Sequence, residues 1–298
     1  MSNFAALTRM RIQLTIRNKM FLFFSVIMPF GFFFLYAGVF AKGVPETVRY
    51  LLGPVVALTV MGSFWGLSAA LVTFREQGIL RRFHVTPVTP SDMLASSVVA
   101  NYFLTLPTVV LELLFARVFF HIHNFGDILA VFILVTVGTV SFASLGLVVA
   151  SVTNTMQETQ IINQLIWTAF LFLSGASVPL AIFPHWIQGA ALFMPATYLA
   201  TGLQAAASGF ASSSELVADF VALTIGLLVA FEISRQLFRW EPEQKVPGRA
   251  KLWVLVAMIP FLAFGIYENV AGTRLEQVRR NFIQLSNRDI PDRPPSSR

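Results

Sequence analysis

The sequence contains no cysteine, and charged residues make up only 12% of its 298 positions. The absence of cysteine excludes disulfides, thiolate metal sites and cysteine nucleophiles. Soluble proteins carry about 25% charged residues. A soluble fold could not hide a composition that is 56% hydrophobic, because much of any folded surface faces solvent. The composition therefore predicts a protein whose main solvent is lipid.

The chain is basic but lacks a continuous basic face. Its net charge is +6 and its pI is about 10.1. The lysines and arginines lie between apolar segments, which is the usual distribution in membrane proteins. We therefore expect membrane lipid as a partner and no nucleic acid.

The sequence also lacks the common catalytic and nucleotide-binding motifs. The phosphate-binding pattern Gly-x-x-x-x-Gly-Lys-Ser/Thr is absent, as are Gly-x-Ser-x-Gly and His-Glu-x-x-His. His121 and His123 lie near Asp127, but we interpret them as loop histidines, because a metal site needs further ligands. We expect no catalytic, cofactor or metal site in this chain.

Six apolar segments are predicted to span the membrane as helices, since about 20 apolar residues cross the hydrocarbon core. They cover residues 20–41, 51–74, 93–120, 128–153, 161–182 and 216–238. Residues 183–208 are broken by prolines and are predicted to form a partly inserted outer hairpin. Residues 252–267 are a shorter seventh candidate, interrupted by Pro260. The predicted class is an all-α integral membrane protein with a six-span helical bundle.

Lysine and arginine near the span ends set the orientation of a membrane protein. With the N-terminus inside, most of the basic residues around the first six spans lie on the inner side. We therefore expect a multi-pass protein of the cytoplasmic membrane. If the seventh segment crosses, which we favour, the basic tail lies outside, against the rule.

This interpretation divides the chain into four predicted regions. Residues 1–19 form an interfacial helix, in which Phe4, Leu7, Met10 and Leu14 share one face. Residues 20–240 form the six-span domain. Residues 241–268 form an inner loop and the seventh span, and residues 269–298 form a polar, basic tail.

The inner loop between the second and third predicted spans is rich in charge. It is predicted to be a short helix at the membrane surface, with an apolar ridge and a charged rim suited to docking a soluble partner. Pro87 ends the helix. The ridge contains Ile79, Leu80 and Phe83, and its charged rim contains Arg75, Glu76, Arg81 and Arg82. Arg75 and Glu76 are expected to be partly exposed.

Glu112 is a carboxylate within an apolar span, which is costly and usually faces a bundle interior or water. One interpretation is that Glu112 is a polar residue on a substrate path. The other is that its side chain is paired within the bundle or, near the outer interface, with Arg117. The sequence leaves both interpretations open.

Two groups of residues resemble a known family. Arg75-Glu76-x-Gly78-x-Leu80 with Thr86-Pro87-Val88 is similar to the coupling-helix signature of the type-2 permeases of ATP-binding-cassette exporters. The second group resembles that family's fifth span and outer hairpin: Ser174-Gly175, Pro179-Leu180, Phe183-Pro184-x-Trp186-Ile187 and Pro195-x-Thr197-Tyr198. The resemblance covers about residues 1–240, and residues 241–298 depart from it.

The resemblance implies a dimeric permease, homomeric or heteromeric, that works with two separate ATPase subunits binding ATP and Mg²⁺. It would export a lipid, a lipid-linked glycan or a drug, and would not itself be an enzyme. The implied coupling residues are Arg75, Glu76, Gly78, Leu80, Arg81, Arg82, Phe83 and Pro87. The implied substrate path contains Glu112, Ser174, Gly175 and Pro179, and the hairpin contains Pro184, Trp186, Pro195 and Tyr198.

Two alternatives remain at this stage. A membrane partner could use the same ATPase coupling for signalling or assembly without transport. An intramembrane lipid-modifying enzyme would need histidines and carboxylates converging at one depth, and the chain has only 4 histidines.

Overall fold

The computed structural model describes residues 3–17, 19–40, 45–209, 213–241 and 243–288. Within these ranges the regular structure is entirely helical, which confirms the predicted all-α class. The first two residues of the predicted interfacial helix, Ala41 of the first predicted span and residues 289–298 of the predicted tail lie outside the described residues.

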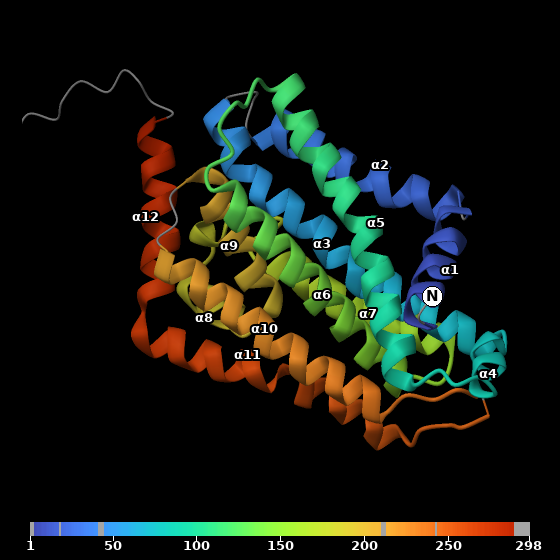
Figure 1. The fold of residues 1–298 in the computed structure, drawn as a ribbon. Coiled ribbons are helices and arrows are strands. Elements are labelled where there is room, and N and C mark those ends of the chain that lie inside the picture. The colour runs from blue at the N-terminus through green and yellow to red at the C-terminus, as the bar shows by residue number, and fades with distance from the viewer. Residues whose placement is uncertain (1–2, 18, 41–44, 210–212, 242, 289–298) are drawn as a thin grey trace, which may run out of the picture.

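Five helices in the described part of the chain are long and apolar enough to cross a membrane. They form the body of the bundle in Figure 1, and this supports a multi-pass membrane protein. The fifth helix continues through Pro260 and so extends the short seventh candidate. The five are α3 (Pro45–Glu76), α5 (Pro90–Phe119), α6 (Ile128–Val152), α10 (Ser213–Gln236) and α11 (Leu252–Ala271).

Two predicted spans are not single continuous α-helices with the predicted bounds. The first corresponds to α2 (Lys19–Leu35) followed by the π-helical segment η1 (Tyr36–Phe40). The fifth corresponds to α7 (Met156–Leu173), so the prediction of one continuous span to Ile182 is wrong. The helix stops because Gly175 has a φ of +82° and the Ser174 hydroxyl accepts a hydrogen bond from the Ala176 N–H. The six-span arrangement stays a prediction.

The central helices approach each other through glycines. A methyl group on Gly146 of α6 would lie 2.2 Å from the Phe64 carbonyl oxygen of α3. A methyl group on Gly53 of α3 would lie 2.4 Å from the Gln204 backbone nitrogen. Small residues permit such close contact between helices in membranes, where packing rather than the hydrophobic effect drives association.

The predicted hairpin contains two short helices, α8 (His185–Ala191) and α9 (Pro195–Ser208). The short element η2 (Leu180–Ile182) precedes it, within the segment predicted as the fifth span. Helix α9 is buried along its whole length. Its C-terminal carbonyls accept hydrogen bonds from the Asp127 N–H and from Arg49 Nε. Helix α9 is therefore an integral part of the bundle core, whereas α8 is partly exposed.

The two ends of the bundle carry different short helices (Figure 1). At one end lies α4 (Ile79–His84), and we call this the α4 end. At the opposite end α12 (Thr273–Arg288) lies across the bundle, and we call this the α12 end. Most of the residues predicted as a polar tail thus form a helix, whose Val278 packs against Leu180 and Ala191.

Candidate functional site

The segment that joins α3 to α5 turns sharply before α4. Helix α3 ends at Glu76, and the Gly78 N–H donates a 3.0 Å hydrogen bond to the Arg75 carbonyl. Gly78 has a φ of +66°, a conformation that costs other L-residues free energy. The glycine therefore sets the angle at which α4 leaves α3.

Arg75 holds the end of α3 to the end of α6. Its Nη1 donates to the Ala150 carbonyl at 2.9 Å, and its Nη2 donates to the Thr153 carbonyl at 2.7 Å. These carbonyls belong to the last turn of a helix, where they lack helical partners and the helix dipole is negative. Arg75 is only 2% exposed, so the interpretation of this residue as a partly exposed rim is wrong.

A second arginine, Arg239, reaches the same helix end from the chain that follows α10. Its Nη2 donates to the Thr153 carbonyl at 2.7 Å and to the Ser151 carbonyl at 3.1 Å, and its Nη1 donates to Asn154 Oδ1 at 3.0 Å. Burial lowers the pKa of Arg239, while the charge of Glu158 acts in the opposite direction. Sequence reasoning used Arg239 only as an orientation signal.

Two carboxylates hold the start of α7 in the same network. Glu76 Oε1 accepts a 2.7 Å hydrogen bond from the Met156 N–H, and Glu158 Oε2 accepts one of 2.7 Å from the Asn154 N–H. Carboxylates are favourable at a helix N-terminus. We name this network the α4-end clamp; its members are Arg75, Glu76, Asn154, Glu158 and Arg239.

The apolar ridge predicted for α4 is divided in the structure. Leu80 is 1% exposed and packs in a cluster with Leu71, Met93 and Leu94, so its placement on an exposed ridge is wrong. A helix of six residues needs such an anchor, because isolated helices of this length are unstable. Ile79 and Phe83 are partly exposed.

The remaining side chains of this segment face outward and form what we call the α4 surface. It projects from the bundle, since Val85 at its tip is 89% exposed. Two adjacent arginines give it positive charge. Its exposed residues are Gln77, Arg81, Arg82, His84, Val85, Thr86 and Pro87.

We expect Gly78→Ala to destabilise the chain by about 1–2 kcal/mol, the usual cost of a left-handed L-residue. A methyl group here meets nothing within 4 Å, so the cost is conformational and not steric. Thermal unfolding in detergent measures it. Gly248→Ala is the matched control, because that glycine also has open space but no positive φ. Equal effects of the two substitutions would contradict this account.

Glu112 is completely buried between α5 and α3. The Thr59 hydroxyl donates a short hydrogen bond to its Oε1. Arg117, by contrast, is exposed. These contacts are those of a side chain held within the bundle, and a role on a substrate path stays a prediction.

The other predicted path residues form the chain reversal after α7. Ser174 and Gly175 make the turn described above, and Pro179 precedes η2 with a φ of −52°. The Tyr36 hydroxyl donates to the Ala176 carbonyl at 3.0 Å and ties this turn to η1. The arrangement shows how these residues shape the hairpin, and their contact with a substrate stays a prediction.

The four predicted hairpin residues occupy different environments. Pro184 is the N-cap of α8 and Pro195 is the first residue of α9, and at both positions the backbone N–H has no partner within the helix. Trp186 is 75% exposed, whereas Tyr198 is buried and its hydroxyl donates to the Leu192 carbonyl at 2.8 Å.

Tyr198 also contacts a buried charge cluster that the sequence analysis missed. Arg274 of α12 lies 2.6 Å from Asp219 Oδ1 of α10 and 3.5 Å from Glu268 Oε1 of α11, and its Nη1 donates to the Thr201 hydroxyl at 3.0 Å. Its guanidinium lies 4.7 Å from the centre of the Tyr198 ring. We call Asp219, Glu268 and Arg274 the α12 ion cluster.

Electrostatics keep the α12 ion cluster charged at its centre. Burial lowers the pKa of Arg274, but the charges of Asp219 and Glu268, a hydrogen bond to Asp219 and the nearby Tyr198 together raise it further, so its pKa lies above the ordinary value. The cluster joins α9, α10, α11 and α12 through one side chain. The sequence around Asp219 and Arg274 does not indicate that these two distant residues form an ion pair.

Residues 2–207 match the family model of the ABC-2 type transporter. This range contains the α4 surface and all of the hairpin except its last residue, and it ends before α10. A comparison with curated proteins found no match.

Proposed function

Since the chain belongs to the ABC-2 type transporter family and is thereby a membrane subunit of an ABC transporter, we propose that it is the permease of an exporter driven by separate ATPase subunits. In this proposal the α4 end faces the cytoplasm and the chain lies in the cytoplasmic membrane. The excess of lysine and arginine on this side supports that orientation.

The α4 surface is the proposed contact with the ATPase. One observation carries this proposal. The α4 surface is exposed and cationic, and the end of α3 that leads into it is held by hydrogen bonds to neighbouring helices. Arg75 and Glu76, at the end of α3, bind α6 and α7 directly. A movement imposed on α4 by closure of the ATPase subunits would therefore reach two further helices.

The substrate class is proposed to be hydrophobic or amphiphilic, such as a lipid, a lipid-linked glycan or a drug. The long apolar helices support this class, because a path for small ions needs more charged and polar groups within the membrane. Glu112 is completely buried within α5 and is held by the hydroxyl of Thr59.

We further propose that two permease chains form the complete membrane unit. Helix α7 exposes three apolar side chains, Ile161, Leu165 and Phe172. They are four and then seven residues apart, so they lie on one side of the helix. A second copy or a related permease chain would cover these side chains. Cross-linking of a single cysteine introduced at Leu165, in a chain with no other cysteine, tests it.

The chain alone is expected to show no saturable binding of ATP, because its sequence has no phosphate-binding loop. Equilibrium binding of a fluorescent ATP analogue to the purified chain in detergent measures this. The same preparation mixed with its ATPase subunits should bind ATP and hydrolyse it. Micromolar binding of ATP by the chain alone would refute the proposal that separate subunits bind ATP.

A further inference from the structure

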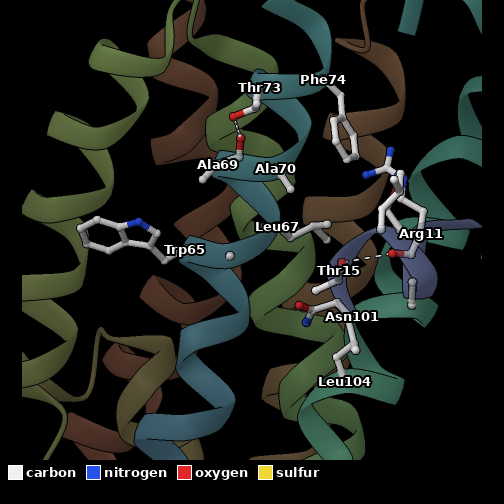
Figure 2. A pocket seen from close by; sticks show the side chains of 14 residues that line it. Arg11, Thr15, Trp65, Leu67, Ala69, Ala70, Thr73, Phe74, Asn101 and Leu104 are labelled. Carbon is white, nitrogen blue, oxygen red and sulfur yellow. Dashed lines mark hydrogen bonds between the residues drawn. The ribbon is translucent and has the colours of Figure 1, made fainter. Parts of the chain in front are cut away.

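A cavity of about 450 Å³ lies between α1 (Asn3–Arg17), α3 and α5. Figure 2 shows side chains of all three helices around it. It extends along α3 from Phe74, two residues before the end of that helix, to Trp65. At 1.5 Å per residue this is a length of about 13 Å. The cavity therefore runs from the α4 end into the bundle.

Arg11 brings a buried positive charge to the wall of this cavity. The residue is 5% exposed. Its Nη2 lies 3.3 Å from the Met93 sulfur, and its guanidinium lies 4.6 Å from the centre of the Phe74 ring. A thioether and an aromatic ring are weak partners that do not neutralise a cation. Burial lowers the pKa of Arg11 to about 10, so the group is charged at neutral pH.

Two buried donors at this cavity have no acceptor within the part of the chain that the structure describes. They are Arg11 Nε and Asn101 Nδ2. The nearby hydroxyls of Thr15 and Thr73 already donate to backbone carbonyls, as Figure 2 shows. Buried donors are rarely left without a partner, because each costs free energy comparable to a lost hydrogen bond. A group that satisfies both donors must be a hydrogen-bond acceptor. Because Arg11 is positively charged, an anionic acceptor fits best.

The rest of the cavity wall is mostly apolar. It includes Leu14 of α1, Leu67 and Ala70 of α3, and Ala100 and Leu104 of α5. An inorganic anion would leave these surfaces without contacts. A molecule with an anionic head and a hydrocarbon chain satisfies both parts of the cavity.

We propose that this cavity binds an anionic lipid of the cytoplasmic leaflet. A phosphate oxygen of the headgroup accepts hydrogen bonds from Arg11 and Asn101, and one acyl chain lies along α3 and α5. The proposal uses the orientation given above but does not depend on ATPase coupling or on the transported substrate.

Tryptophan fluorescence provides the test, because Trp65 lines the cavity. The purified chain in detergent is titrated with brominated phosphatidylglycerol or brominated phosphatidylcholine, whose bromines quench tryptophan on contact. We expect the anionic lipid to bind about tenfold more tightly, as expected for charge-assisted hydrogen bonds. Trp65→Phe should remove the saturable component. Equal affinity for the two lipids would overturn the proposal.

Arg11→Gln should abolish the preference for the anionic lipid, and Arg9→Gln, which changes an exposed arginine of the same helix, should retain it. Ala100→Phe keeps Arg11 but fills the cavity, so it should weaken binding of both lipids even if Arg11→Gln does not fold. Retained preference in Arg11→Gln, or unchanged binding in Ala100→Phe, would refute the site. Displacement of the lipid by millimolar inorganic phosphate would identify a free anion as the ligand and would also refute it.

Discussion

Arg274→Met is expected to destabilise the folded chain by about 3–5 kcal/mol, the usual cost of removing one partner from a buried ion pair. The substitution leaves Asp219 and Glu268 without the cation that lies 2.6 Å and 3.5 Å from them. It also removes the guanidinium from the face of Tyr198. Thermal unfolding in detergent, followed by circular dichroism, measures the loss.

The matched control is Arg280→Met, because Arg280 lies on the same helix but is exposed. It should change stability little. The triple variant Arg274→Met, Asp219→Asn and Glu268→Gln removes all three charges, so it should recover much of the loss. An unfolding midpoint for Arg274→Met equal to that of Arg280→Met would show that the α12 ion cluster contributes little to stability.

Charge reversal on the α4 surface is expected to weaken binding of the ATPase without changing the stability of the folded chain. Arg81→Glu with Arg82→Glu should weaken association with the ATPase by at least about 30-fold, since charged contacts desolvated at an interface are worth about 2–5 kcal/mol. The folded chain itself should be unaffected, because both side chains are exposed. Co-purification with the ATPase and ATP-dependent transport in vesicles measure the first effect, and unfolding in detergent measures the second.

Arg279 and Arg280 provide the control, because they are also adjacent, exposed arginines but lie at the α12 end. Their conversion to glutamate should leave ATPase binding intact. Normal ATPase binding by the Arg81→Glu, Arg82→Glu variant would exclude the α4 surface as the docking site. Glu76→Lys is a poorer test, because Glu76 accepts a hydrogen bond from the start of α7 and its loss would perturb the α4-end clamp.

The sequence was sufficient for features that depend on local composition. Long apolar segments predicted α3, α5, α6 and α10 closely, because span length is set by the membrane and not by partner residues. The charge-rich loop with Gly78 and Pro87 predicted a short surface helix, which is α4. The end of α7 was misplaced, since the turn at Ser174 and Gly175 interrupts an uncharged segment that looks continuous by hydropathy.

Features that depend on distant pairs were not predictable. Arg11 is one of several basic residues in the segment predicted as an interfacial helix, yet it is buried against Phe74 and Met93, which lie far along the chain. Arg75 looked like a surface charge, yet it binds carbonyls of α6. A single sequence shows that an arginine is present, but only the packing of helices decides whether carbonyls or water surround it.

The α12 ion cluster also sets an order of events during synthesis of the protein. Asp219 belongs to α10, which leaves the ribosome well before Arg274 of α12. At about 5–20 residues per second, roughly 3–11 s pass between the two. During that time the nascent chain holds Asp219 without Arg274, and burying a carboxylate in lipid is unfavourable. We infer that α10 reaches its final position only after α12 has been synthesised. A ribosome that stalls before Arg274 would then leave a chain in which α10 is not yet held by the α12 ion cluster.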